Sequence, residues 1–293
     1  MKPLAIRKKI SSRHAKTIAL LRSLLLLPTL SFFVTSRADA SFSFRGADAR
    51  IEAMGGAGVA LNGAPFGIVY NPAAGGGGKR GAAGIAYSVP FGEASLETFH
   101  AAIVKNHLPF DRDACAALSY QRHGYEPYRE TAVRASYSKA VTGPLRAGVT
   151  AGLLERDAGK TSSSAFGLDL GFLAVISDSF SIGGAAFNLN SPEIGESGET
   201  VTAITFAGAA YRPADGVLLT AAVENRENSD ARLHSGGEVL LLRDVALRAG
   251  FTTNPETVTG GVGFTTGDLT GDIAVVRHPD LGAGAWYAMS VTF

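Results

Sequence analysis

The sequence has very little cysteine and little charge. Cys115 is the only cysteine among 293 residues, and Asp, Glu, Lys and Arg together make up 18% of the chain. A chain with a single cysteine forms no internal disulfide, so packing and hydrogen bonds must hold its fold together. Beyond position 40 no run of 18 apolar residues occurs, which excludes a membrane-spanning helix in that part of the chain. These absences alone still allow a soluble exported domain.

The motifs of common enzymes are also missing. No Gly-x-Ser-x-Gly elbow occurs, the six histidines are scattered without metal-ligand spacing, and Gly56-Ala57-Gly58 lacks the strand–helix–strand unit of a dinucleotide loop. His234 and Glu238 lie four apart on one expected strand face, but lining an interior is the plainer interpretation for His234 and for His100. We therefore expect no enzymatic activity, no cofactor and no metal site.

The first forty residues have the parts of a secretory signal peptide. Six basic residues precede an apolar run from Thr17 to Ser36, and Ala38-Asp39-Ala40 is a small-x-small cleavage site before Ser41. The alternative, an uncleaved membrane anchor, is disfavoured by this cleavage site and by Arg22 within the run. We predict export, with cleavage near Ala40 and Ser41.

Cleavage changes the charge balance of the chain. Eight of the 27 Lys and Arg residues and one of the 26 Asp and Glu residues leave with the signal, so the remainder carries 19 basic and 25 acidic residues, a net charge of −6. No basic patch remains for binding a polyanion, and we expect no nucleic-acid partner.

From Lys79 onward the chain breaks into pieces of about 9–13 residues, separated by turn-forming clusters such as Thr142-Gly143-Pro144. Within a piece, apolar residues alternate with small, polar or charged ones. In Leu145–Leu153, for example, every second residue is apolar. Fourteen such pieces between Lys79 and Phe293 predict fourteen β-strands, each with one apolar face.

This pattern fits two architectures. In a soluble sandwich the apolar faces meet in a shared core, whereas in a membrane barrel they face lipid and the other faces line a lumen. The barrel is favoured because the pieces have the roughly 9–11 residues that a tilted strand needs to cross a bilayer, and because their number is even. We predict an all-β fold, a closed antiparallel transmembrane β-barrel of about 14 strands. Its lumen-lining candidates are charges in mid-strand on the non-apolar face: Arg134, Arg146, Asp169, Glu224, Arg226 and Arg248.

The last piece adds a second indication. Tyr287, Met289, Val291 and Phe293 form one apolar face, and the chain ends on Phe293. A terminal amphipathic strand that closes on an aromatic residue is typical of the insertion signal of outer-membrane barrels. Many other β domains also end on a strand, so the signal is specific only together with the export peptide and the alternation.

A stretch between the signal and the first strand, Arg45–Ala74, is too rich in Gly and Ala and too irregular to be a strand. Its run Ala53–Ala60 allows close backbone packing, because glycine has no Cβ atom. A segment in this place is interpreted as a plug inside the barrel. We therefore predict three parts: a signal peptide (1–40), an N-terminal plug segment (41–78) and a transmembrane β-barrel (79–293).

The same stretch carries a recognisable pattern: an Arg, then Met-Gly-Gly-Ala-x-Val-Ala, then after a short gap Tyr-Asn-Pro-Ala. It resembles the N-terminal signature of the PorV/PorQ outer-membrane proteins, within the wider FadL-like (OMPP1/FadL/TodX) superfamily. The likeness in motif covers about thirty residues; the gap Leu61–Gly67 lacks the acidic residues common in the family, and no long extracellular loop is evident except Ser191–Gly198. The resemblance assigns a plug or gating motif to Arg50, Met54, Gly55, Gly56, Ala57, Tyr70, Asn71, Pro72 and Ala73.

The resemblance implies two functions for the barrel. In FadL-type channels the inward-folded segment gates the passage of hydrophobic molecules, whereas in PorV-type proteins the barrel handles secreted proteins. We expect a protein of the outer membrane of a Gram-negative-type bacterium that passes small hydrophobic molecules, with a structural or secretion-associated role as the alternative. A periplasmic enzyme on a soluble β scaffold is a third possibility. The expected partners are outer-membrane lipid, the barrel-assembly machinery, and hydrophobic small molecules or secreted proteins.

Overall fold

The computed structural model describes residues 42, 46–63, 65–75, 80–195, 198–227 and 229–293. The chain divides into two compact units, Met1–Ser36 and Arg37–Phe293. The first unit lies outside the described residues, and so do the predicted signal peptide and its cleavage site.

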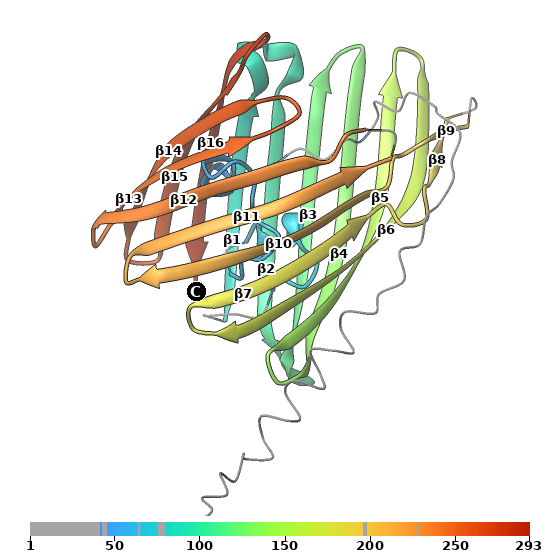
Figure 1. Ribbon diagram of the computed structural model, residues 1–293. Coiled ribbons are helices and arrows are strands. Elements are labelled where there is room, and N and C mark those ends of the chain that lie inside the picture. The colour runs from blue at the N-terminus through green and yellow to red at the C-terminus, as the bar shows by residue number, and fades with distance from the viewer. Residues whose placement is uncertain (1–41, 43–45, 64, 76–79, 196–197, 228) are drawn as a thin grey trace, which may run out of the picture. The chain divides into compact units, whose positions relative to one another are not determined.

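The second unit is a closed barrel of fourteen antiparallel strands (Figure 1). Each strand pairs with its neighbour in the chain, and β16 closes the barrel on β1, so the predicted architecture and strand number are confirmed. A separate two-stranded hairpin, β8 Glu193–Ile194 and β9 Glu199–Thr200, lies between β7 and β10. The barrel strands are β1 Gly81–Val89, β2 Thr98–Leu108, β3 Asp111–Tyr125, β4 Tyr128–Thr142, β5 Leu145–Ala158, β6 Thr161–Ser177, β7 Phe180–Phe187, β10 Ile204–Ala214, β11 Val217–Arg226, β12 Arg232–Leu242, β13 Val245–Thr252, β14 Thr257–Thr266, β15 Leu269–His278 and β16 Gly282–Thr292.

The two faces of the strands differ as predicted. Large apolar side chains point outward and are about half exposed, such as Ile85 at 54%, Leu153 at 56% and Met289 at 52%. The alternate positions are small, polar or charged and are mostly buried toward the interior. This arrangement excludes the sandwich, in which the large apolar side chains would be covered by a second sheet.

The strands are less uniform in length than expected. They range from eight residues in β7 and β13 to 17 in β6, and β3 to β6 are all 14 or longer. The outward face of β6 is apolar only from Phe166 to Ile176, and it is polar at Ser162 and Ser164. The extra length of β6 therefore lies beyond the apolar band that faces lipid.

The connections at the two ends of the barrel differ in length. At one end, here called the turn end, six connections have two residues each: 109–110, 143–144, 178–179, 215–216, 243–244 and 267–268. At the other end, here called the mouth end, connections reach 90–97, with short helices η1 Pro90–Gly92 and η2 Ala94–Leu96, and 188–203, which contains β8 and β9. The expected long loop at Ser191–Gly198 thus falls within the longest connection.

The barrel closes where its first strand, β1, pairs with its last strand, β16. The Gly81 amide donates to the Phe293 carbonyl at 2.8 Å, and the Phe293 amide donates to the Gly81 carbonyl at 2.9 Å. The side chains of Tyr287, Met289, Val291 and Phe293 all point outward and are 40–52% exposed. The predicted insertion signal therefore lies on the lipid-facing side, and its role in insertion stays a prediction.

Among the residues described ahead of the barrel there are two short α-helices, α2 Ala49–Ala53 and α3 Gly67–Tyr70. Asp48 begins α2 as its N-cap, because its side chain accepts from the Arg50 amide at 2.9 Å. None of the helices in the described residues is long and apolar enough to cross a membrane.

Candidate functional site

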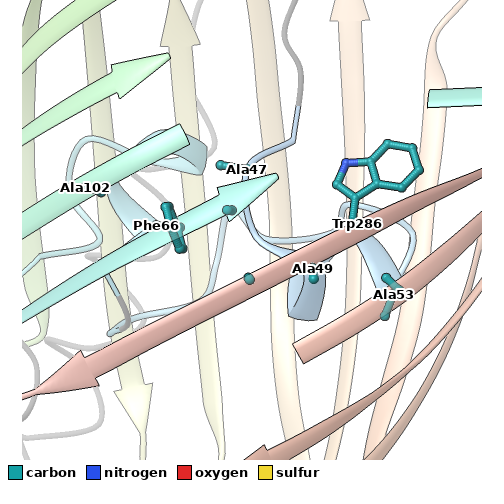
Figure 2. Close-up of a cluster of buried hydrophobic side chains, with 9 residues drawn as sticks. Ala47, Ala49, Ala53, Phe66, Ala102 and Trp286 are labelled. Atoms are coloured by element: carbon teal, nitrogen blue, oxygen red, sulfur yellow. The ribbon is translucent and has the colours of Figure 1, made fainter. Parts of the chain in front are cut away.

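Residues 46–63 and 65–75, here called the plug, lie against the inward faces of the barrel strands. Helix α2 packs on β13, β14, β15 and β16. Its alanines Ala49 and Ala53 are fully buried in a cluster with Phe66 and with Trp286 of β16 (Figure 2). Because other parts of the plug contact strands on the far side of the barrel, as described next, the described residues of this segment occupy the lumen.

The plug fits because the wall lacks side chains where the plug backbone approaches. A Cβ atom added to Gly236 of β12 would lie 2.5 Å from Met54 Cα, and one added to Gly261 of β14 would lie 2.7 Å from Ala53 Cβ. Both are far inside van der Waals contact. Eight inward-facing glycines on eight strands meet the plug in this way: Gly84, Gly148, Gly171, Gly183, Gly208, Gly236, Gly250 and Gly261.

Arg50 ties α2 to the wall through a chain of charges, here called the Arg50 latch. Its Nε and Nη2 each donate to Glu238 of β12 at 2.7 Å, a two-bonded carboxylate contact. Arg248 of β13 donates to the same Glu238 at 2.6 Å and to Asp272 of β15 at 2.6 Å. Positive and negative groups of the plug and the barrel thus alternate along this chain, and their mutual attraction offsets the desolvation cost of burying them.

Asn71 holds the other half of the plug by neutral hydrogen bonds. Its Nδ2 donates to the Val59 carbonyl at 2.7 Å and to the Phe172 carbonyl of β6 at 2.8 Å, while its Oδ1 accepts from the Ala73 amide at 2.9 Å. Asn71 is fully buried, as is Pro72 beside it. The Asn-Pro-Ala motif therefore ties the plug both to itself and to the barrel.

A histidine makes a third contact between plug and wall. The Gly55 carbonyl can only accept, so His234 Nδ1 donates to it, at 2.6 Å. His234 Nε2 lies 3.0 Å from a carboxylate oxygen of Glu224, which also contacts Arg226 and Arg232. Those two guanidinium groups stabilise the Glu224 carboxylate.

Two acidic groups of the plug lie close together, Asp48 buried and Glu52 half-buried. The Tyr70 hydroxyl donates to Glu52 Oε1 at 2.9 Å and accepts from the Asp48 amide at 3.1 Å. Burial raises the pKa of Glu52 to about 7 and that of Asp48 to about 6, because water no longer stabilises their charged forms. The acidic forms of both groups therefore persist to higher pH than in a free chain.

All of the predicted plug residues are brought together in this site. Arg50, Tyr70 and Asn71 make the contacts described above. The small and apolar members, Met54, Gly55, Gly56, Ala57, Pro72 and Ala73, provide close backbone packing. Their assignment to gating stays a prediction, since the structure fixes their places and not their motion.

The six predicted lumen charges point inward but do not form one site. Arg248 belongs to the Arg50 latch, Glu224 contacts His234, and Arg226 contacts Glu224. Arg134 of β4 lies 4.0 Å from Asp169 of β6. The remaining charge, Arg146, lies near the turn end and donates to the Asp113 carbonyl at 3.3 Å.

Sequence reasoning missed the partners of these charges. The sequence indicates that His234 lines the interior and lies on one strand face with Glu238, whereas in the structure each of the two contacts the plug, through Gly55 and Arg50. The inward glycines left a signal in the sequence, since Gly occupies non-apolar positions of many strands. Their function depends on where the plug lies, and strand periodicity carries no information about that.

Two cavities border the plug. The larger, here called the vestibule, has about 470 Å³ and lies toward the mouth end above Glu52, Gly55 and Gly56. The smaller, between the plug and β2–β7, has about 30 Å³, room for about two waters. In the described part of the chain, no three His, Cys, Asp or Glu side chains are placed to hold a metal ion.

Known structures share this fold. The Pseudomonas putida toluene transporter TodX is 12% identical, with a TM-score of 0.60 over 85% of this chain and 97% of that one. The CymD monoaromatic hydrocarbon channel is 11% identical, with a TM-score of 0.68 over 86% and 99%. A Pseudomonas aeruginosa FadL homologue is 12% identical, with a TM-score of 0.64 over 87% and 99%. The chain therefore has the barrel fold of FadL-like outer-membrane channels.

Sequence comparison adds one partial match. A family model described as "F plasmid transfer operon, TraF, protein" matches residues 139–270, which is less than half of the chain. No curated protein matches the chain. The resemblance to PorV/PorQ stays a prediction.

Proposed function

We propose that the protein is an outer-membrane channel that passes small hydrophobic molecules and is closed by its plug in this structure. The observation that carries the proposal is the plug itself. It lies in the lumen directly below the vestibule and is attached to the wall by a few separate polar contacts, those of Arg50, Asn71 and His234. A purely structural plug would gain more from apolar contacts, since buried charges add little net stability.

The two barrel ends support the orientation of such a channel. Outer-membrane barrels have short periplasmic turns and longer extracellular loops. The turn end, with its six two-residue connections, would then face the periplasm, and the mouth end with the vestibule would face the exterior. A solute from outside reaches the vestibule before it meets the plug.

The vestibule suits an amphipathic small molecule. Part of its wall is apolar, with Phe91, Leu96, Val276 and Trp286, and part is polar, with Arg226 and His234. A volume of about 470 Å³ lies within the range of sites for small molecules, roughly 300–1,000 Å³. Access to the turn end requires the plug to shift, because its described residues contact wall strands on both sides of the lumen.

Uptake by whole cells tests the proposal. In a Gram-negative host that lacks its own uptake channels, we expect radiolabelled toluene or decanoic acid to enter faster with Glu238→Gln than with the unchanged protein. This substitution weakens the Arg50 latch. The matched control is Glu256→Gln, which removes the same charge from an exposed turn. Equal uptake by both variants and by a chain lacking residues 46–75 would refute a gated passage.

A secretion-associated role is the second candidate, and the partial match to the TraF family model favours it. Under this interpretation the barrel is an envelope component that binds exported proteins or parts of a transfer apparatus. Recovery of defined envelope proteins with the detergent-extracted barrel, together with no solute uptake by any variant, would favour this role. If the protein could be extracted without detergent, both of these functions would be excluded, and the third possibility, a periplasmic enzyme, would be favoured.

A further inference from the structure

A row of polar side chains crosses four neighbouring strands near the mouth end. His123 of β3 pairs with Thr98 of β2, and Thr98 pairs with Ser88 of β1. Ser88 pairs in turn with Trp286 of β16. All four residues line the vestibule. Residues directly opposite on adjacent strands have Cβ atoms about 4.5–5.5 Å apart, so the row forms one continuous band on the wall of this cavity.

The first half of this row is bonded within the protein. The Thr98 hydroxyl lies 2.8 Å from His123 Nδ1 and 3.4 Å from the Leu96 carbonyl. Both Thr98 and His123 are buried. The Thr98 hydroxyl and His123 Nδ1 are therefore already engaged.

The second half of the row is different. Ser88 is 3% exposed and Trp286 is 9% exposed, yet within the described residues neither the Ser88 hydroxyl nor the Trp286 indole N–H forms a hydrogen bond. Neither atom is fully enclosed, so both can reach a molecule in the vestibule. Buried donors in native proteins are nearly always paired. Two adjacent unpaired ones that line a cavity therefore indicate a binding position for a polar ligand atom.

The surroundings of Trp286 are otherwise apolar. On the plug side, its indole belongs to the buried cluster that contains Ala47 and Ala49 (Figure 2). On the vestibule side, Phe91 and Val276 line the cavity beside it. A few placed polar groups in an apolar wall recognise a ligand that has a polar atom on an apolar body.

The charged groups of the vestibule are already paired with one another. Glu224 of β11 contacts Arg226, Arg232 and His234. An ionic ligand would have to displace these contacts, whereas a neutral ligand needs only the two groups that lack partners. The vestibule therefore favours a neutral ligand.

We propose that the vestibule binds a small apolar molecule with one hydroxyl group, an alcohol or a phenol, through Trp286 and Ser88. The hydroxyl oxygen accepts from the indole N–H, which can only donate, and the hydroxyl proton is donated to the Ser88 oxygen. This inference rests on the proposed function and names the class of solute. Binding needs no movement of the plug, so it can be measured separately from passage.

Two probes of nearly the same shape test the proposal, cyclohexanol and methylcyclohexane, which differ by a hydroxyl in place of a methyl group. Each is titrated calorimetrically into the full barrel in lipid nanodiscs, with empty nanodiscs as the blank. A neutral hydrogen bond changes affinity by about two- to tenfold. We expect Ser88→Ala to weaken cyclohexanol binding by that factor and to leave methylcyclohexane binding unchanged. The matched control is Ser290→Ala, on β16 like Trp286 but at the turn end.

Trp286 is the one tryptophan of the chain, so its fluorescence reports the contact directly. Cyclohexanol should shift the emission to longer wavelength, because a hydrogen bond to the indole N–H stabilises the excited state, and methylcyclohexane should not. Trp286→Phe keeps an aromatic ring but removes the donor, and it should weaken cyclohexanol binding more than methylcyclohexane binding.

Two results would overturn the proposal. One is a loss of affinity in Ser88→Ala that is equal for both probes. The other is cyclohexanol binding that falls with Arg226→Gln and not with Ser88→Ala, which would assign recognition to the charged wall. Neither result bears on hydrocarbon uptake, and absent uptake with intact cyclohexanol binding would refute passage alone. If Trp286→Phe fails to fold, Ser88→Ala and the fluorescence of the unchanged barrel still decide.

Discussion

A single methyl group at Gly236 should loosen the plug while leaving the barrel intact. In Gly236→Ala, the new Cβ would lie 2.5 Å from Met54 Cα and 2.6 Å from the Met54 carbonyl carbon. Unbonded carbons pack at about 3.5–4.0 Å, so the overlap is about 1 Å. The strand itself can accept alanine, because Gly236 has no positive φ angle.

The plug cannot simply move away from the new methyl group. Two strands along the wall, on β14, the Thr259 hydroxyl donates to the Ala53 carbonyl at 2.8 Å, and the Gly55 amide donates to the same hydroxyl at 3.0 Å, which holds this part of the plug against the wall. Overpacking of this kind costs about 1–3 kcal/mol. Since 1.4 kcal/mol is a factor of ten, the population with an unseated plug should rise by about 5- to 150-fold.

Conductance of single barrels in a planar bilayer measures that population. We expect Gly236→Ala to spend more time in a conducting state, with normal heat-modifiable gel mobility as a sign of a folded barrel. The matched control is Gly271→Ala on β15, where an added Cβ has open space around it. The reasoning would be refuted if both variants conducted alike, because the close fit of plug and wall would then have no energetic weight.

Three further outcomes follow from the structure. Asn71→Asp keeps the shape of the side chain but replaces the amide that donates to two backbone carbonyls by a carboxylate, which repels them. Protease cleavage of the plug should therefore become at least tenfold faster. The control is Asn254→Asp, which lies in an exposed turn. Glu52 and Asp48 have raised pKa values when the plug is seated, so the seated state binds more protons than the unseated state. The attachment of the plug should therefore weaken as pH rises from about 4.5 to 7. A time spent in the conducting state that is no greater at pH 8 than at pH 5 would contradict this. Deleting Phe293 removes the last hydrogen bonds between the chain ends, and less barrel should show heat-modifiable mobility than with Phe293→Tyr.

The strand pattern could be predicted because the alternation of apolar and polar residues within one strand reflects which of its faces meets lipid and which meets the interior. Val149 and Thr150 differ in burial for a local reason, the direction of successive side chains, and period two recurs along every strand. The number of strands follows from counting the turn clusters. The length of β6 could not be predicted in this way, since Thr161–Ser164 is compatible with either a turn or the end of a strand.

The contacts of the plug could not be predicted because they join residues far apart in the chain. Arg50 was recognised as part of a motif, but its partner Glu238 lies 188 residues away. Gly148 and Gly171 look like ordinary small residues of a lumen face until Asn71 and Pro72 are placed against them. In each case the sequence identifies one partner, and only the closed barrel brings it to the other.

The two halves of the plug are held by different kinds of contact, and this difference predicts where opening begins. The half around α2 carries ionisable groups, the Arg50–Glu238 pair and the acids Glu52 and Asp48, so salt and pH act on it. The half around Asn71 is attached by amide hydrogen bonds and by close packing, which neither condition changes appreciably. A rise in pH therefore frees α2 from β12–β15 first, while Asn71 still holds the plug to β6. Because the vestibule lies above α2, the first opening forms directly beneath the cavity that a solute from the mouth end would occupy.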